Sequence, residues 1–342
     1  MLNLSEKSDS IDKLSVENSL LIYEGKYDKE QIITSIVIPT YKRSALLFET
    51  VRSCEKIYNK SEFEIIIVFN ARQESAEIVG YIKEKRISNV RVYENKENIG
   101  MFQNWNQGAL LAAGKWVSIM HDDDMYEAAF FDLVNPLLVN APSNTAYINF
   151  NGKIITDEKY VDLRQETVTK IALKKAKLID IKILGVSPFF ATTCGTLIKR
   201  EILLKMGGFD ADTYPSGDVL FPIKLLNNGY SCFICSKKIN YYRKQMNASL
   251  KKDVMDMFIY YYGELQNEIY EKGKTTWFYF LFKKCLYFKA VWHVFMQADS
   301  CGIILDSPRP DSSIQRTLKY KIMDAIQRVY WKLKWNQLKV WR

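Results

Sequence analysis

The sequence predicts an α/β fold, in which a doubly wound and mostly parallel sheet is followed by a C-terminal helical extension. Short apolar runs of strand length alternate with segments of helical periodicity as far as residue 124. This rhythm is typical of a parallel sheet with helices on both faces. From about Asp253 onward the pattern is helical and rich in aromatic residues. The 342 residues, of which 48% are hydrophobic, supply enough apolar material for a full core.

The first half of the chain carries the clearest alternation. We predict strands at residues 35–38, 64–69, 90–93 and 115–120, and helices at residues 44–57, 75–86 and 101–113. Ser44 is the expected N-cap of the first helix, and Gly114 follows the last of them. Ligands of such sheets bind beyond the carboxyl ends of the strands. The loops after three of these strands are therefore expected to meet at one site.

The second half is more mixed. We predict strands at residues 146–150, 195–199 and 231–242, the last as one strand or two, and helices at residues 171–184 and 219–228. A short helix is expected to lead into Gly207-Gly-Phe-Asp210. We therefore expect a loosely ordered leader over residues 1–31, an α/β domain over residues 32–245 and a C-terminal helical region over residues 246–342.

Charge and hydropathy exclude two classes of protein. The net charge is +9, but eight Lys or Arg residues and one acid lie between Arg316 and Arg342, which leaves the rest nearly neutral. A nucleic-acid-binding protein is expected to spread basic charge over its folded domain, so we expect no nucleic-acid partner. No stretch offers the roughly 20 apolar residues of a membrane span. The polar N-terminus and six scattered cysteines indicate a cytoplasmic location.

Asp122, Asp123 and Asp124 follow an apolar strand directly, and we name them the acidic run. Adjacent carboxylates repel one another, so a fold that gathers them at a strand end favours a bound cation. Oxygen ligands suit Mg²⁺ or Mn²⁺, which commonly bridge carboxylates to substrate phosphates. The alternative is a solvated acidic turn.

Asp218 lies 95 residues beyond Asp123 and opens a predicted helix. A carboxylate at this position can deprotonate an acceptor hydroxyl. The alternative is an N-cap aspartate that accepts hydrogen bonds from helix N–H groups.

Three segments of the chain are more specific together, in this order, than any one of them alone. They are SIVIPTYKR at residues 35–43, NKENIGMFQNWNQGALLAAGKWVSIMHDDD at residues 95–124 and CGTLIKREILLKMGGFDADTYPSGD at residues 194–218. In this order they resemble the family 2 glycosyltransferases, which have the Rossmann-like GT-A fold. The resemblance is to members that act in bacterial surface-polysaccharide synthesis, for example the synthesis of O-antigen. The resemblance covers about residues 34–243. It implies an inverting, single-displacement transfer of a sugar from a nucleotide diphosphate donor, with Mn²⁺ or Mg²⁺ as cofactor.

The resemblance also implies roles for individual residues. Asp218 matches the catalytic base, and the acidic run occupies the DxD region, with Asp123 and Asp124 at the metal. Further positions match the donor-binding set: Pro39, Thr40, Tyr41, Arg43, Asn70, Asn98, Gly100, Asn104, Asp122 and Arg243. Asn106 falls in the same part of the family pattern, and Arg243 is expected to reach the diphosphate.

Two positions depart from the family pattern. Asn70 stands where an aspartate that binds the nucleobase is usual, and an amide donates as well as accepts. A UDP-sugar is favoured over a GDP-sugar, although less firmly than for a typical member. Phe69 stacks on the base or belongs to the core. His121 stands at the first DxD position, where a structural histidine is favoured over a phosphate ligand.

The C-terminal tail combines an apolar helical line with basic and tryptophan residues. The line consists of Leu318, Ile322, Ala325, Ile326, Val329 and Leu333, and the tryptophans are Trp331, Trp335 and Trp341. Such a helix suits an anionic membrane surface, and the alternative is a helix packed on the catalytic domain. The membrane interpretation predicts a peripheral protein on the inner face of the cell membrane and a polyprenyl-diphosphate-linked glycan acceptor, bound through residues 157–190.

Two other functions share parts of this pattern. A nucleotidyltransferase also pairs a doubly wound sheet with acidic metal ligands, but usually shows a glycine-rich loop after the first strand, and Pro39-Thr-Tyr-Lys-Arg43 has no glycine. A non-catalytic nucleotide-sugar-binding module is disfavoured by the intact acidic run and Asp218.

Overall fold

A computed structural model describes residues 6–72, 75–139, 141–155, 176–178, 193–243, 250–271 and 277–337. The strands are β1 (Ser19–Glu24), β2 (Thr34–Thr40), β3 (Phe63–Phe69), β4 (Val90–Asn95), β5 (Trp116–Ile119), β6 (Met125–Tyr126), β7 (Thr145–Ile155), β8 (Ala176–Leu178), β9 (Thr196–Lys199) and β10 (Ser231–Arg243). The helices are α1 (Ser44–Ser53), α2 (Ala76–Glu84), α3 (Met101–Leu111), α4 (Ala128–Val139), α6 (Arg200–Lys205), α7 (Gly217–Asn227), α8 (Lys252–Glu271), α9 (Trp277–Ser300), α10 (Ser313–Arg316) and α11 (Leu318–Gln337).

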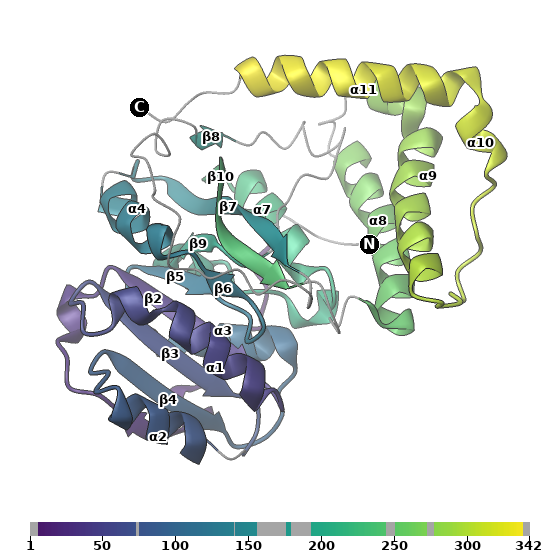
Figure 1. Cartoon of the computed structure of the whole chain (residues 1–342). Coiled ribbons are helices and arrows are strands. Elements are labelled where there is room, and N and C mark those ends of the chain that lie inside the picture. Colours follow the sequence, from purple (N-terminus) through teal and green to yellow (C-terminus); the bar gives the residue numbers. More distant parts are fainter. Residues whose placement is uncertain are drawn as a thin grey trace.

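Over these described ranges the strands form one ten-stranded mixed sheet, in the order β1-β4-β3-β2-β5-β9-β7-β10-β6, with β8 paired to β10 (Figure 1). Strands β4, β3, β2 and β5 run parallel, and Val37 of β2 pairs with Ile66 on one side and Ile119 on the other. Strand β9 is antiparallel to β5 and β7, whereas β7 and β10 are parallel. Strands β2 and β3 are buried along their whole length, as expected between two helical layers.

Helices cover both faces of the sheet, which confirms the predicted doubly wound α/β fold. On one face, side chains of α1, α2 and α4 pack with Ile36 and Ile65 in one apolar cluster. On the other face, side chains of α3, α6 and α7 pack with Val37 and Ile66. Alternate residues of each strand thus enter opposite cores, because strand side chains point alternately to the two faces.

The predicted strands and helices up to residue 120 are confirmed, with small shifts of their ends. One detail was wrong: Ser44 is the first residue of α1, its N-cap is Arg43, and no side chain caps the helix. Helix α1 ends at Ser53 and is followed by a 3-10 turn, Glu55–Ile57. Helix α4, which follows the acidic run, was not predicted.

The predicted helix at residues 171–184 was wrong where it can be checked. Residues 176–178 form β8, which pairs antiparallel with Phe233–Cys235 of β10. Strand pairing overrides a local helical pattern there, since propensity is weaker than tertiary context. The other residues of that segment, and most of the expected acceptor region at 157–190, lie outside the described residues.

The segment expected to be a loosely ordered leader is folded from residue 6 onward. Strand β1 pairs with β4 at the edge of the sheet. Ahead of it, the Ser8 N–H donates to Met206 O at 3.1 Å and the Ile11 N–H donates to Gly207 O at 3.1 Å. Gly207 has φ +79°, and a Cβ there would lie 1.8 Å from Ser8 O. The N-terminal segment therefore holds the glycine turn that precedes Asp218.

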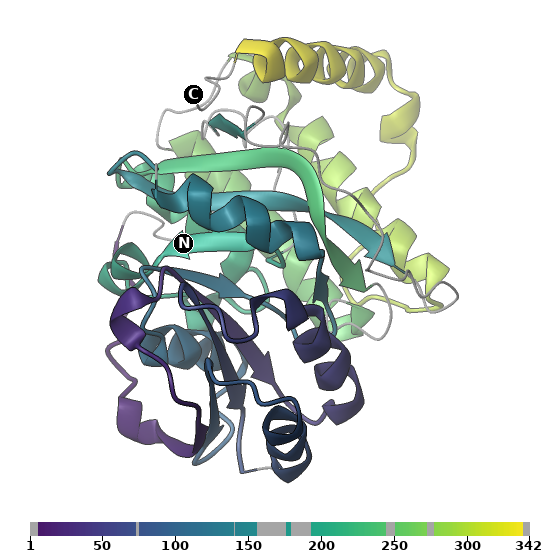
Figure 2. The same cartoon turned by 60° about the vertical axis from the view of Figure 1, so that its left-hand side comes forward.

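The C-terminal helices α8, α9 and α11 lie together at the end of the molecule opposite β3 and β4, as the two ribbon views show (Figures 1 and 2). Helix α11 packs on α9, where buried Met323 lies in one cluster with Phe282 and Leu286. Among the described helices, none combines the length and apolar character needed to cross a bilayer. The division of the chain at residues 31 and 245 stays a prediction.

Candidate active site

The acidic run lies where β5 ends, beside the carboxyl end of β2. Thr40, the last residue of β2, donates from Oγ1 to Oδ2 of Asp122 at 2.8 Å, and the Tyr41 N–H lies 3.4 Å from the same oxygen. Two parallel strand ends therefore meet at the Asp122 carboxylate. Burial raises the pKa of Asp122 to about 6, even though the Thr40 hydroxyl favours its charged form.

Arg43 neutralises part of this charge. Its Nη1 donates to Oδ2 of Asp123 at 2.7 Å and lies 3.4 Å from Oδ1 of Asp122. Asp122 and Asp123 are both buried. One guanidinium thus bridges two buried carboxylates of the acidic run.

Asp124 is fully buried and held from two elements. The Arg243 N–H, at the end of β10, donates to its Oδ1 at 2.9 Å, and Thr50 of α1 donates to its carbonyl oxygen at 2.8 Å. The Arg243 side chain donates from Nε to Asp123 O at 3.0 Å and pairs with Glu49. Arg243, expected at the diphosphate, thus holds the backbone of the acidic run.

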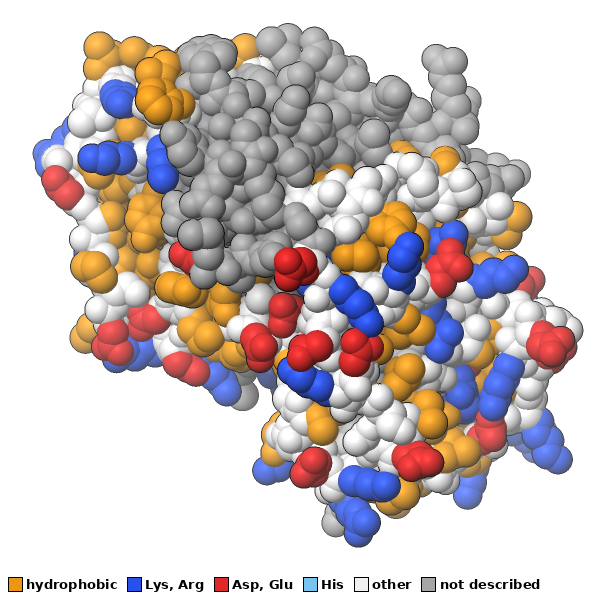
Figure 3. Space-filling view, turned by 180° about the vertical axis from the view of Figure 1, so that it is seen from behind, with side chains coloured by type: hydrophobic (Ala, Val, Ile, Leu, Met, Phe, Trp, Pro, Cys, Tyr) orange, Lys and Arg blue, Asp and Glu red, His pale blue; other side chains and the backbone are white. Residues whose placement is uncertain are grey.

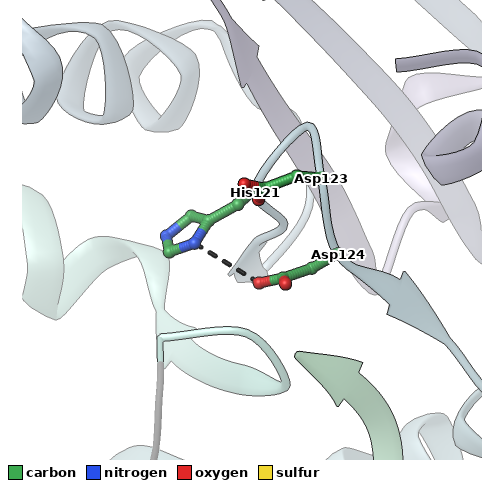
Figure 4. A group of neighbouring side chains, drawn as sticks. All are labelled: His121, Asp123 and Asp124. Atoms are coloured by element: carbon green, nitrogen blue, oxygen red, sulfur yellow. Dashed lines mark ion pairs between the residues drawn. The ribbon is translucent and has the colours of Figure 1, made fainter. Parts of the chain in front are cut away.

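His121 completes a group that can hold a metal ion. Its Nδ1 lies 3.3 Å from Oδ2 of Asp124, and ligand atoms of His121, Asp123 and Asp124 all lie within 4.8 Å of one another (Figure 4). Among the described residues, His121 Nε2 is a buried polar atom without a hydrogen-bond partner, and Asp124 Oδ2 has no contact of regular hydrogen-bond geometry besides this ion pair. Carboxylate oxygens suit Mn²⁺, and a neutral imidazole is a further ligand for a divalent transition-metal ion. The residues therefore fit the predicted metal.

The electrostatics of His121 link this group to Asp218. Burial opposes the imidazolium, but the carboxylates of Asp124, Asp123 and Asp218 outweigh it and raise the pKa of His121 to about 9. The ring also packs on Trp105, with 5.0 Å between ring centroids. The field of Asp218 therefore acts on the same imidazole that pairs with Asp124.

Asp218 is the second residue of α7 and is partly exposed. It is not the N-cap, which is Ser216. Thr193 donates from Oγ1 to its Oδ2 at 2.9 Å, and its Oδ1 accepts from the Val219 N–H at 2.9 Å. Burial raises the pKa of Asp218, while Thr193 and then His121 act in the opposite direction.

The predicted asparagines form a separate amide network. Asn70 donates from Nδ2 to Asn98 Oδ1 at 3.0 Å and to Gly100 O at 3.1 Å, and its Oδ1 accepts from the Ile99 N–H. Asn104 is buried and donates to Val68 O at 3.2 Å. Asn70 and Asn104 therefore use their amides to fix strand ends, and the exposed Asn98 is the member open to solvent.

The remaining predicted positions fall into two groups. Pro39 and Phe69 are buried in strands. Phe69 belongs to the apolar core, which confirms the second of its two predicted roles. Gly100 has φ +84° and is the N-cap of α3, which explains a glycine there. Tyr41 is exposed. A hydrogen bond with Asn98 lowers the pKa of Tyr41, and the interaction with Lys42 adds to this effect.

Asn106 has a structural part of its own. It donates from Nδ2 to Phe209 O at 2.7 Å and accepts from the Phe209 N–H at 2.8 Å. A Cβ at Gly208 would lie 2.4 Å from its Oδ1. The asparagine of α3 therefore fixes the Gly207-Gly-Phe-Asp210 turn.

The sequence favoured a structural role for His121, which the structure places in the candidate metal group. Two further residues of the site carry no signal in the sequence. Thr193 and Glu49 were not singled out, because their partners Asp218 and Arg243 lie far away in the sequence. Nothing in the local pattern marks either of them.

Comparison with known proteins agrees with this architecture. Residues 35–207 match the model of a family described as Glycosyl transferase family 2. S. aureus TarS 1-349 in complex with UDP-GlcNAc is similar with a TM-score of 0.50 and 16% identity, over 86% of this chain and 79% of that one. The mannosyltransferase PcManGT from Pyrobaculum calidifontis, in complex with GDP-Man and Mn²⁺, is similar with a TM-score of 0.54 and 13% identity, over 90% of this chain and 87% of that one. At such identities the likeness shows the fold. No curated protein matches significantly.

Proposed function

The chain belongs to glycosyl transferase family 2 and has the GT-A fold, and from this membership we propose that it is a metal-dependent, inverting enzyme. In this proposal residues 32–245 move a sugar from a nucleotide diphosphate to a hydroxyl of a glycan acceptor. The observation that carries the proposal is the group of His121, Asp123 and Asp124, whose ligand atoms lie within 4.8 Å of one another. It supports an acidic metal-binding group, and the smaller effect of Asp218 on the pKa of His121 supports a proton acceptor in the same site.

In the proposed reaction Asp218 accepts the proton of the acceptor hydroxyl. The acceptor oxygen forms a bond to the anomeric carbon, while the bond from that carbon to the diphosphate oxygen breaks on the opposite side. The configuration at the anomeric carbon is therefore inverted. The raised pKa of Asp218 supports this role, because a carboxylate with a higher pKa is a stronger base.

His121, Asp123 and Asp124 are the residues that would hold the divalent ion, Mn²⁺ or Mg²⁺, with Asp122 on the donor side. When bound, the ion supplies positive charge that stabilises the leaving diphosphate. Arg43 is a second cation at the same place, and Tyr41 and Asn98 offer exposed polar groups to the donor. The loops of the donor site would be held in place by Gly100 and by the buried residues Pro39, Thr40, Asn70 and Asn104.

For the donor we propose a UDP-sugar ahead of a GDP-sugar. The two similar structures hold UDP-GlcNAc and GDP-Man. Asn70 cannot offer its amide freely to a base, because the loop at Asn98–Gly100 engages it. Base selection therefore falls to groups around the exposed Tyr41 and Asn98.

For the acceptor we propose a polyprenyl-diphosphate-linked glycan of surface-polysaccharide synthesis, reached on the cytoplasmic face of an anionic membrane. Helix α11 supports this. Leu318, Ile322, Ala325 and Val329 are exposed along one side of it, whereas Met323 and Gln327 are buried. Exposed Lys321 and Arg328 flank the apolar side. The side of the molecule that carries α9 to α11 also gathers hydrophobic side chains (Figure 3). A basic, amphipathic surface of this kind suits anionic lipid.

The experiment that tests the proposal is thermal unfolding with Mn²⁺ and a panel of UDP, GDP, CDP and their sugars. We expect Mn²⁺-dependent stabilisation by a uridine diphosphate and its loss in Asp123→Ala. Asp132→Ala, which removes an exposed carboxylate of α4, is the control and should respond like the wild type. Stabilisation by no nucleotide, with or without Mn²⁺, would contradict the proposal.

A further inference from the structure

The guanidinium of Arg43 and the candidate metal group share one carboxylate. Arg43 Nη1 lies 2.7 Å from Asp123 Oδ2. Asp123 is also one of the three residues whose ligand atoms lie within 4.8 Å of one another. A cation held by His121, Asp123 and Asp124 therefore lies within a few ångströms of a fixed positive charge.

The surroundings make this competition strong. Asp123 is 8% exposed, so little water is available to screen charges around it. The Arg43 side chain is 35% exposed, which leaves it room to move toward solvent. It projects from a tight loop, in which Lys42 has φ +56° and Arg43 itself is the N-cap of α1.

We propose that Arg43 is a resident counter-cation of the acidic run, which a divalent ion must displace from Asp123. Ion binding then releases the guanidinium toward the diphosphate of the donor. This second half rests on the proposed function, whereas the first half depends only on the cluster itself.

The chemistry of the two cations explains the exchange. A guanidinium and a divalent ion both bind carboxylate oxygens, but only the ion also takes the imidazole of His121 as a ligand. Arginine binds phosphate oxygens with two parallel hydrogen bonds, so a diphosphate is a suitable new partner. Arg43 thereby couples ion binding to donor binding.

The test is titration of the full chain with Mn²⁺ alone. Binding is measured through the electron paramagnetic resonance signal of free Mn²⁺. We expect Arg43→Met to bind Mn²⁺ about tenfold more tightly than the wild type, because a competing positive charge is gone. Arg43→Lys, which keeps the charge, should stay close to the wild type. Unchanged or weaker Mn²⁺ binding in Arg43→Met would overturn the proposal, since a merely structural arginine predicts that result.

Lys42→Met is the matched control. It removes one positive charge from the same loop, next to Arg43, where the Lys42 ammonium lies 5.2 Å from the centroid of the Tyr41 ring. Its Mn²⁺ affinity should stay within about twofold of the wild type. An equal gain in both variants would overturn the proposal, because it would reflect net charge alone.

Titration with UDP at saturating Mn²⁺ tests the second half. Arg43→Met should bind UDP about tenfold more weakly, because a charged hydrogen-bond donor to phosphate is lost. Tighter Mn²⁺ binding with unchanged UDP binding would overturn the release toward the diphosphate. The Mn²⁺ titration needs no sugar donor, so its outcome is independent of whether the protein transfers a sugar. Absence of Mn²⁺ binding in every variant would overturn the competition itself.

Discussion

Thr193 donates a hydrogen bond of 2.9 Å from Oγ1 to Oδ2 of Asp218. The two residues lie 25 positions apart, and the contact joins the segment before β9 to the first turn of α7. Thr193 stabilises the charged form of Asp218 and lowers its pKa against the effect of burial. It is therefore a positioning residue for the proposed base.

Thr193→Val should slow transfer and move its pH dependence. Without the hydroxyl the pKa of Asp218 rises, so the base is protonated up to a higher pH. The acid limb of the kcat/KM profile should shift upward, and kcat at neutral pH should fall about tenfold. Thr193→Ser should restore both. A slower enzyme with an unshifted profile would contradict the role of Thr193 in setting this pKa.

Asp123→Ala should weaken metal-dependent donor binding and turnover together. The carboxylate contributes to the metal group and also neutralises Arg43. Calorimetry with UDP, with and without Mn²⁺, should show that the gain from Mn²⁺ is lost. Full Mn²⁺-dependent UDP binding in this variant would show that the ion lies elsewhere.

Glu64→Gln should destabilise the fold and change its response to acid. Burial alone would raise the pKa of Glu64, but Arg91 and hydrogen bonds from Ser35, Tyr27 and Ala113 outweigh it, so the pKa lies below the ordinary 4.5. The stability from this ionised group is fully present above about pH 4.5 and is lost as the pH falls through the lower folded-state pKa. At neutral pH we expect a loss of about 3 kcal/mol, because the buried Arg91 loses the carboxylate with which it forms an ion pair.

Urea unfolding of the wild type and Glu64→Gln checks this prediction. It is measured from about pH 3, where carboxylates titrate, up to neutral pH. The difference between wild type and Glu64→Gln should shrink as the pH falls. Glu62→Gln, which changes an exposed carboxylate two residues before Glu64, just ahead of β3, is the control and should be nearly neutral. A constant difference at every pH would contradict the assignment.

Replacement of the exposed apolar side of α11 should release the protein from membranes. Leu318, Ile322 and Val329 are 72%, 43% and 58% exposed. Their joint change to Ser should reduce co-sedimentation with phosphatidylglycerol vesicles, because apolar area buried at the interface drives such binding. Leu20→Ser with Ile22→Ser, on exposed strand β1, is the control.

Truncation after Pro310, which removes α10 and α11, should have the same effect on vesicle binding. Phosphatidylcholine vesicles should bind the wild type weakly, since basic residues contribute through anionic lipid. Equal binding of the wild type and the α11 variants to anionic vesicles would remove the basis for a membrane-bound acceptor.

The parallel part of the sheet could be predicted because most of its strands contain a short apolar run and are separated by turn residues. Strand β3, Phe63–Phe69, is recognisable from the apolar run at residues 65–69. Strand β1 was missed because it is an edge strand with exposed Leu20 and Leu21, and a polar leader surrounds it. Strand β8 was missed because three residues carry too little periodicity to outweigh a helical neighbourhood.

The acidic run and Asp218 could be found because their motifs are local, but their partners could not. Thr193 and Glu49 act through contacts that only the folded chain brings together. Asn70 and Asn104 matched the family pattern, yet their buried amides fix the loop and the strand end. A motif identifies which residues recur, whereas burial decides which of them face a ligand.

The proposal depends most directly on Asp218 as the proton acceptor at a metal-dependent donor site. The measurement that tests it is turnover of a UDP-sugar by Asp218→Asn, with UDP affinity at saturating Mn²⁺ measured on the same protein. We predict that UDP affinity stays within about twofold of the wild type while kcat falls by a factor on the order of 10³. Turnover close to that of the wild type would show that the base lies elsewhere.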